Sequence, residues 1–220
     1  MPEELAQLLD VLVDAETYNR GAFTLYKGVL AGKRVLVAQC GIGKVNAAAL
    51  AQIFVLEGAR QLIFTGVAGG LAPDLAVGDI VVSTDAVQHD VDVSALGYAL
   101  GEVPGEPFSW AADETLRGAA LRAAQALGEV KVVAGRVLSG DQFIADREQG
   151  RALYRAFDGL CAEMEGAAAA QICNRAGVPF VIVRSISDSA DGGAGGDFRT
   201  FTPLAARRAK AVVLGMLEHL

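Results

Sequence analysis

Hydrophobic positions fall into two patterns that succeed each other along the chain. Runs that are apolar at nearly every position predict buried strands at residues 35–39, 61–65, 80–83, 131–138 and 178–184. Alanine-rich stretches between them predict helices at residues 3–15, 45–57, 113–127, 147–156, 163–176 and 203–219. Strands that are apolar on both faces and alternate with helices are typical of a parallel or mixed sheet covered on both sides. The chain is therefore expected to form one α/β domain over residues 1–220, with an irregular loop at 87–110 that is rich in glycine and proline.

The composition narrows the class of protein. Of the 220 residues, 52% are hydrophobic, as in a globular protein, and the formal net charge is −7. A chain this acidic is not expected to bind nucleic acid or an anionic membrane surface. Its three cysteines stand singly and it has only two histidines, so a metal site is not expected. No stretch is long and apolar enough to span a bilayer and no leader pattern opens the chain, which predicts a cytoplasmic protein.

The last predicted strand ends in polar residues. Residues 180–183 are apolar, and Arg184, Ser187 and Asp188 follow them. Ligands of α/β sheets bind at the carboxyl ends of strands, so Asp188 is the first candidate for chemistry, although a strand-terminal aspartate also fits a helix cap or a structural acceptor. Asp191 and the glycine-rich residues 192–196 predict a mobile loop over the site.

Further candidates lie in short motifs. Glycine-rich turns follow two predicted strands, at residues 40–46 and 65–71. Glycines there let a ligand approach the backbone, and a helix start offers free N–H groups, but each turn alone is better explained as a tight turn. Glu163 and Glu165 stand at a predicted helix start, where they either complement the helix dipole or hold vicinal hydroxyls. Asp141 fits a turn, and Phe143 fits either the core or an aromatic face for a flat ring.

Several longer motifs occur in a fixed order. They are Gly-Ile-Gly-Lys-Val at 41–45, Thr-Gly-Val-Ala-Gly-Gly-Leu-Ala-Pro at 65–73, Val-Gly-Asp-Ile-Val-Val-Ser at 77–83, Ser-Gly-Asp-Gln-Phe-Ile at 139–144, Glu-Met-Glu at 163–165 and Arg-Ser-Ile-Ser-Asp at 184–188. Together they resemble the 5′-methylthioadenosine/S-adenosylhomocysteine nucleosidases of the nucleoside phosphorylase superfamily. The resemblance covers nearly the whole chain. It implies a three-layer α/β/α sandwich around a twisted mixed sheet, a homodimer, and hydrolysis of 5′-thio-substituted adenosines without a metal or organic cofactor.

The resemblance also assigns catalytic roles, residue by residue. Asp188 would protonate N7 of adenine with the support of Ser187, and Glu165 would hold the ribose hydroxyls. Glu4 would bind and activate the attacking water, helped by Arg184. The chemistry is consistent, because departure of adenine needs a carboxyl group that still holds its proton, whereas the group that orients the water must be ionised.

The same resemblance implies which residues line the substrate. Phe143 and Ala68 would flank the base, and the backbone of Ile144 would read its edge. Met164 and Phe198 would contact the sugar and the 5′ substituent, with Met1, Val67 and Gly69 as further substrate-binding positions. The 5′-alkylthio pocket would be lined by Ile42, Val93 and Pro104, and by Leu96 and Tyr98 of the partner subunit.

Two positions depart from the family pattern. The family's chain opens with a strand that this sequence lacks before Met1. Either the natural start lies upstream of Met1, which is the favoured hypothesis, or the sheet lacks its first strand and Glu4 lies on a frayed terminus. Val67 stands where the family usually has a serine near the ribose, so one hydroxyl contact is lost.

Three other functions stay open at this point. A nucleoside phosphorylase needs cationic and hydroxyl donors for phosphate. Uridine-type phosphorylases carry them where Phe64 and Val67 stand here, and Glu4 would repel phosphate, which favours hydrolysis. Hydrolysis of another 5′- or 6-substituted purine nucleoside, of futalosine type, would depend on the shape of the 5′ pocket. A non-catalytic nucleoside-binding protein would follow if Glu4 is misplaced.

Overall fold

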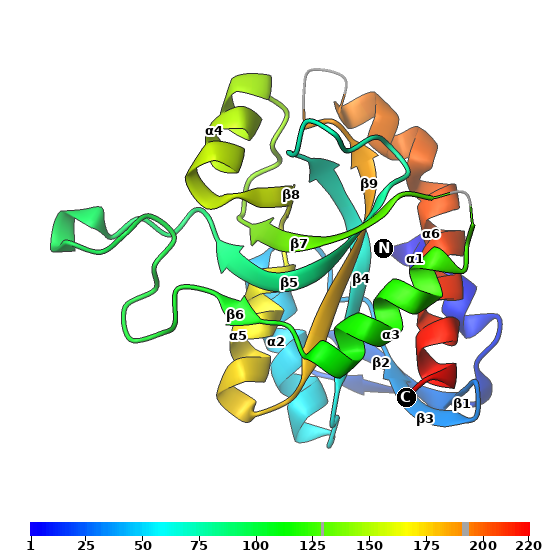
Figure 1. Cartoon of the computed structure of the whole chain (residues 1–220). Helices are drawn as coiled ribbons and strands as arrows, with labels where there is room; N and C mark the ends of the chain where they lie inside the picture. The colour runs from blue at the N-terminus through cyan, green and yellow to red at the C-terminus, as the bar shows by residue number, and fades with distance from the viewer. Residues whose placement is uncertain (129, 191–193) are drawn as a thin grey trace.

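The computed structural model describes residues 1–128, 130–190 and 194–220, and the side chains of residues 1–128, 130–190 and 201–220 (Figure 1). The helices are α1 (Pro2–Leu9), α2 (Lys44–Leu56), α3 (Glu114–Gln125), α4 (Arg147–Phe157), α5 (Gly166–Ala176) and α6 (Ala194–Glu218), with a short 3-10 helix η1 (Ser94–Leu96). The strands are β1 (Val13–Arg20), β2 (Phe23–Leu30), β3 (Lys33–Val37), β4 (Leu62–Gly70), β5 (Ile80–Gln88), β6 (Trp110–Ala111), β7 (Val132–Ser139), β8 (Gly159–Glu163) and β9 (Phe180–Asp188).

The central sheet is mixed and has the strand order β6-β5-β7-β8-β4-β9. β4 runs parallel to β9, β7 runs parallel to β5 and β8, and β4 is antiparallel to β8. β5 also pairs with β9, which curls the sheet back on itself. Helices α2 and α5 pack together on one face, and α3 and α6 on the other (Figure 1). The predicted α/β/α sandwich around a twisted mixed sheet is therefore confirmed.

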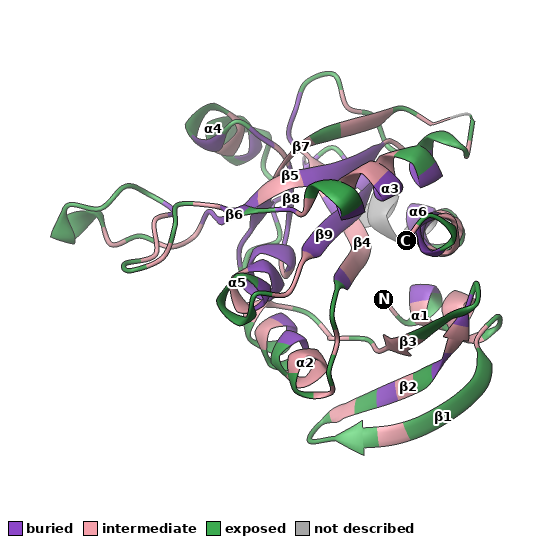
Figure 2. Ribbon diagram, turned by 60° about the horizontal axis from the view of Figure 1, so that its bottom comes forward, coloured by how far each residue is buried: buried purple, intermediate pink, exposed green. Residues whose placement is uncertain are grey.

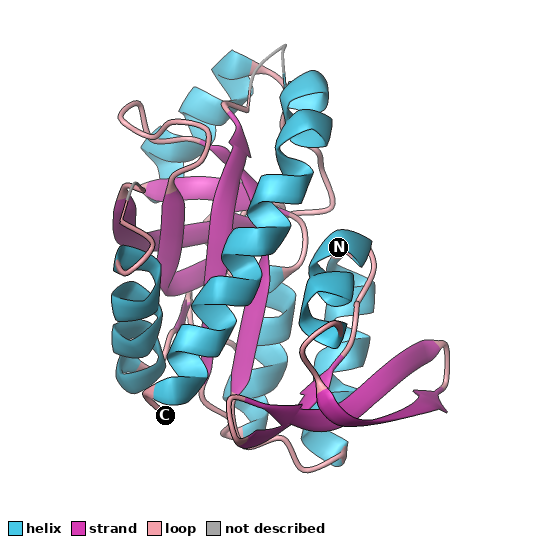
Figure 3. Ribbon diagram, turned by 90° about the vertical axis from the view of Figure 1, so that its right-hand side faces the viewer, coloured by secondary structure: helices cyan, strands magenta, loops and turns pink. Residues whose placement is uncertain are grey.

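A second, smaller sheet with the order β1-β2-β3 differs from the sequence prediction. The pattern predicts one helix over residues 3–15, whereas α1 ends at Leu9 and β1 begins at Val13. β1 is polar and almost entirely exposed, so it lacks the alternation of apolar residues that indicates a strand (Figure 2). Figure 3 shows this sheet to one side of the long α6 helix. The expectation that a first strand before Met1 is missing stays a prediction.

Two further boundaries differ in ways that matter for the site. The sequence predicts that Glu163 opens a helix, but it is the last residue of β8, and α5 begins only at Gly166. The helix expected from Pro203 begins at Ala194, so that Pro203 lies inside α6 and residues 194–196 do not form the expected loop. Proline favours the first turn of a helix, which is why the pattern placed the start there. Asp191, Gly192 and Gly193 lie outside the described residues.

The irregular segment between β5 and β6 forms an arm that projects from the body (Figure 1). Apart from η1 it contains no regular element, as its glycine and proline content predicts. Exposed apolar side chains stand on it, namely Leu96, Tyr98, Leu100 and Phe108. Among the described residues, no helix has the length and hydrophobicity needed to cross a membrane.

Candidate active site

The parallel register of β4 and β9 places polar side chains against glycines. Gly66 lies opposite Arg184, and Gly69 lies opposite Asp188. A Cβ atom on Gly66 would stand 2.6 Å from Arg184 Nη1, and one on Gly69 would stand 3.0 Å from Asp188 Oδ1. These glycines therefore do more than form a tight turn, because the close approach of two functional side chains requires them.

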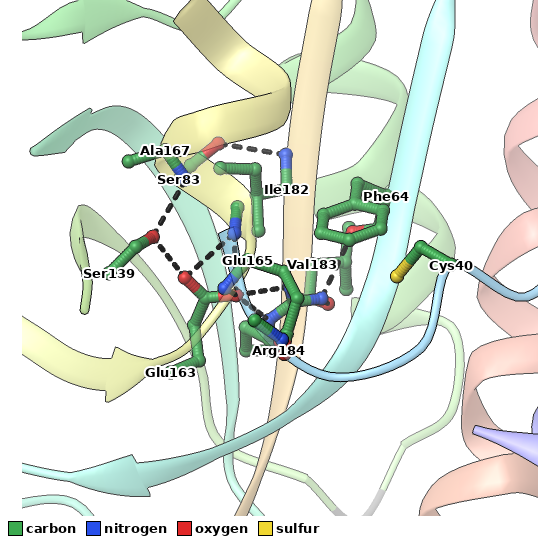
Figure 4. A network of polar contacts seen from close by, with 12 residues as sticks. Cys40, Phe64, Ser83, Ser139, Glu163, Glu165, Ala167, Ile182, Val183 and Arg184 are labelled. Atoms are coloured by element: carbon green, nitrogen blue, oxygen red, sulfur yellow. Dashed lines mark hydrogen bonds and ion pairs between the residues drawn. The ribbon is translucent and has the colours of Figure 1, made fainter. Parts of the chain in front are cut away.

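Glu163 is the centre of a buried polar network (Figure 4). Its carboxylate accepts hydrogen bonds from the Gly166 N–H at 2.8 Å, from Arg184 Nε at 3.1 Å, from Arg184 Nη2 and from the Ser139 hydroxyl. Ser139 Oγ in turn accepts from the Ala167 N–H at 2.7 Å. The ends of β7 and β8 are in register at Ser139 and Glu163, so the network follows from the sheet. From the sequence, Glu163 is a candidate only as one of two carboxylates at a predicted helix start, and Ser139 is not predicted as a site residue.

Arg184 is fully enclosed and remains charged. Burial lowers the pKa of its guanidinium, but the Glu163 and Glu165 carboxylates outweigh this and hold the pKa above its usual value. The guanidinium also lies 4.6 Å from the centre of the Phe64 ring, in a cation–π arrangement. The position of Arg184 is thus set by an ion pair on one side and an aromatic ring on the other.

The Glu165 side chain makes different contacts from that of Glu163. It is the N-cap residue of α5, yet its side chain does not cap that helix and accepts from the Gly43 N–H at 2.8 Å. The two interpretations of this motif therefore separate, since Glu163 satisfies the free N–H groups of α5 and Glu165 faces the glycine turn. Burial, and next the negative charge of Glu163, raise the pKa of the Glu165 carboxyl.

Asp188 is the last residue of β9 and is 2% exposed. Its Oδ2 accepts from the Ser187 hydroxyl at 2.9 Å, and its Oδ1 accepts from the Ala190 N–H at 2.9 Å. The second bond is the structural acceptor role that the sequence left open. The first agrees with a supporting role for Ser187, whose Oγ also lies 3.4 Å from the Ala68 carbonyl.

Glu4 is buried in the first turn of α1, at 4% exposure. Its negative charge helps to raise the pKa of the Arg184 guanidinium. The Met1 nitrogen donates to Glu4 Oε2 at 2.8 Å. Its other oxygen, Oε1, is buried and has no hydrogen-bond partner among the described residues. Buried polar atoms are normally satisfied, so this oxygen is suited to bind a water molecule.

The residues expected to line the substrate range from buried to exposed. Phe143 is 54% exposed, whereas Ile144 beside it is buried. Partial exposure is shared by Val67, Val93 and Met164, and Ala68 is buried. Ile42, Pro104, Leu96 and Tyr98 are exposed, the last three on the arm. Phe198 belongs to α6, but its side chain lies outside the described part of the structure.

The thiols take no direct part in this arrangement. All three cysteines are free. Burial, and next the charge of Glu165, raise the pKa of the Cys40 thiol to about 11, and burial raises that of Cys173 to about 12. Both therefore stay protonated at neutral pH. The described residues also contain no group of three or more His, Cys, Asp or Glu that could hold a metal ion.

Known proteins resemble the chain over its full length. The model of the phosphorylase superfamily matches residues 1–218. A 5′-methylthioadenosine/S-adenosylhomocysteine nucleosidase of Actinobacillus succinogenes is 43% identical, over 100% of this chain and 96% of its own. The Neisseria meningitidis nucleosidase in complex with methylthio-immucillin-A has a TM-score of 0.96 and 41% identity, over 100% of this chain and 96% of that one. A futalosine hydrolase of Helicobacter pylori has a TM-score of 0.95 and 35% identity, over 100% and 95%.

Proposed function

Because the chain belongs to the 5′-methylthioadenosine/S-adenosylhomocysteine nucleosidases of the phosphorylase superfamily, we propose that it hydrolyses the N-glycosidic bond of both nucleosides. The products are adenine and the 5′-thioribose. The observation that carries the proposal is the presence of two separate groups. One is the buried Asp188 carboxyl with the Ser187 hydroxyl bonded to it, and the other consists of Glu4, Glu165 and Arg184. No cofactor takes part in it.

The steps follow from these groups. Asp188 gives its proton to N7 of adenine, and the electrons of the C1′–N9 bond pass to the base as the bond breaks. The sugar becomes an oxocarbenium-like cation, which the negative charge of Glu165 stabilises while it holds the ribose hydroxyls. Glu4 removes a proton from a water held with the help of Arg184, and the hydroxide adds to C1′. The sum is one water consumed and one N-glycosidic bond broken.

The charge balance favours water over phosphate as the nucleophile. The cluster contains three carboxylates, of Glu4, Glu163 and Glu165, against two cations, the Arg184 guanidinium and the Met1 ammonium group that bonds to Glu4. That guanidinium is already engaged by Glu163 and by the Phe64 ring. A phosphate dianion would need several cationic donors at once, whereas a neutral water molecule needs only one. The described part of the cluster therefore fits hydrolysis better than phosphorolysis.

The deciding experiment is incubation with methylthioadenosine, with and without phosphate, while free adenine and the sugar product are measured. We expect equal rates of adenine release and free methylthioribose as the sugar. Strict phosphate dependence, with methylthioribose 1-phosphate as product, would instead make the protein a phosphorylase. Binding without turnover would identify a nucleoside-binding protein.

A futalosine-type nucleoside is the second candidate substrate. One observation favours it, the likeness to the Helicobacter pylori futalosine hydrolase. The ratio of kcat/KM for the two nucleosides distinguishes the candidates. A ratio in favour of the futalosine-type compound would replace the first proposal.

Glu4→Gln is expected to lower kcat by about a hundredfold or more, because the amide cannot take a proton from water. Steady-state kinetics of adenine release measure the effect. Glu3→Gln is the matched control, since Glu3 lies in the same turn of α1 but is exposed. Retained hydrolysis in Glu4→Gln would mean that another group activates the water.

We further propose a cytoplasmic homodimer, in which the arm of one subunit completes the 5′ pocket of the other. The exposed Leu96 and Tyr98 on this arm support the proposal, because apolar side chains that gather on a projecting segment are typical of an interface. Sedimentation equilibrium at micromolar concentration should give a particle of two chains of 22.8 kDa. A single chain at that concentration would contradict it.

A further inference from the structure

A closed set of polar contacts joins three separate segments beside the proposed site. Lys44 Nζ donates to Asp90 Oδ1 at 2.6 Å, and the Asp141 N–H donates to Asp90 Oδ2 at 2.9 Å. The Lys44 N–H donates to Asp141 Oδ1 at 2.8 Å, which closes the triangle. The three residues lie at the start of α2, just after β5 and just after β7. Asp141 is therefore more than the turn residue that the sequence predicts.

The Lys44–Asp90 pair is shielded and charged. The two side chains are 17% and 14% exposed. Burial raises the pKa of Asp90, but the bonds from Lys44 and from the Asp141 N–H outweigh it and hold the pKa below its usual value. Gln88 Oε1 accepts from Lys44 Nζ at 3.0 Å, and the Gln88 amide donates to Gln171 of α5 at 2.8 Å. The triangle is thus anchored to the helix layer.

Two of the three joined segments carry different parts of the proposed nucleoside site. The segment before α2 contains Ile42, and its Gly43 N–H donates to the Glu165 carboxylate. The segment after β7 carries Phe143 and Ile144, which are proposed to hold the base. The start of α2 also offers no free Gly43 or Lys44 N–H to a ligand, because Glu165 and Asp141 accept from them. These N–H groups fix the segments to one another and do not bind an anion.

We propose that Lys44, Asp90 and Asp141 are positioning residues that set the separation between the ribose side and the base side of the site. The inference rests on the proposed function. A ligand that occupies one side needs only that segment in place, whereas an intact nucleoside spans both and needs their spacing to be correct. Fixing that spacing before binding reduces the ordering cost that the nucleoside would otherwise bear.

Lys44→Met removes the charge and keeps the length of the side chain. We expect kcat/KM for methylthioadenosine to fall about tenfold or more, mainly through KM, because the loss is in pre-organisation. The inhibition constant of adenine alone should change by less than about twofold, since the base side is intact. Asp90→Asn should have the same effect on kcat/KM. The double variant should have a kcat/KM no lower than that of the less active single variant, because the two residues act as a unit.

Lys131→Met is the matched control. Lys131 pairs with Asp74 at 2.7 Å in an exposed setting outside the triangle, so its removal should leave kcat/KM and KM unchanged. An equal loss for adenine and nucleoside in Lys44→Met would overturn the inference, as would unchanged kinetics or additive losses in the double variant. If Lys44→Met does not fold, Asp90→Asn gives the same comparison.

A failure of the proposed function gives a different experimental result from a failure of the positioning role. Wild-type protein that does not turn over methylthioadenosine contradicts the proposed function alone. The inference is then tested by calorimetric dissociation constants of methylthioadenosine and adenine for wild-type protein and Lys44→Met. Selective weakening of the nucleoside supports the positioning role, and equal weakening overturns it.

Discussion

Asp188→Asn is expected to lower kcat by about a thousandfold or more and to leave the fold intact. The amide has the shape of the carboxyl group, and its oxygen can still accept from the Ala190 N–H, so the end of β9 keeps its geometry. It cannot donate a proton to N7, and loss of a general acid removes about two to four orders of magnitude in rate. Single-turnover measurement of adenine release isolates the chemical step.

Asp146→Asn is a suitable control for this variant. Asp146 also accepts from a backbone N–H, that of Gln149 at 2.8 Å, but it caps α4 at the surface and asparagine is an equally good cap. Its kcat should equal that of the wild type. Near-normal kcat in Asp188→Asn, with the thermal midpoint unchanged, would show that the proton comes from another group.

Glu165→Gln is expected to lower kcat/KM by about a hundredfold to a thousandfold, because a fixed negative charge beside the developing sugar cation is lost. The amide oxygen can still accept from the Gly43 N–H, so the glycine turn should stay in place. The effect should appear in kcat as well as KM, since the charge matters most in the transition state. Glu148→Gln, on the exposed side of α4, should have wild-type kinetics.

The pH profile gives a second measure of the same residue. Burial and the neighbouring Glu163 raise the pKa of Glu165, so its ionised form is lost at a higher pH than in an ordinary glutamate. Acidification should therefore reduce the wild-type rate while most surface carboxylates are still ionised, and Glu165→Gln should lack this limb. If the acidic limb of the pH profile persists unchanged in Glu165→Gln, the limb belongs to a different group.

Some residues of the site could be predicted from the sequence and others could not, and the reason is physical. Asp188 stands at a strand end because an apolar run turns polar there, and this pattern is local. The role of Glu163 depends on Arg184 and Ser139, which are distant in sequence. They meet Glu163 only through the pairing of β7 with β8 and of β8 and β9 with the intervening β4. A local pattern cannot distinguish Glu163 from Glu165, because both precede the same helix.

The fold shows the same division. Four strands of the central sheet, β4, β5, β7 and β9, could be located, since burial on both faces leaves a continuous hydrophobic run. The buried strand β8 was not predicted, because its apolar run is only three residues long. β1 could not, because its residues face solvent and its strand conformation comes from pairing with β2. The predicted start of α6 at Pro203 is nine residues too late, since α6 begins at Ala194 and contains Pro203, although proline favours the first turn of a helix.

The glycines of β4 divide the protein into a part that tolerates redesign and a part that does not. A Cβ atom at Gly66 would stand 2.6 Å from Arg184 Nη1, and one at Gly69 would stand 3.0 Å from Asp188 Oδ1, so that a larger residue at either position would displace these side chains. The rear wall of the site is consequently closed to substitution, whatever substrate a designer has in mind. Changes of specificity are better sought at positions such as Ile42, whose side chain is exposed in the single chain.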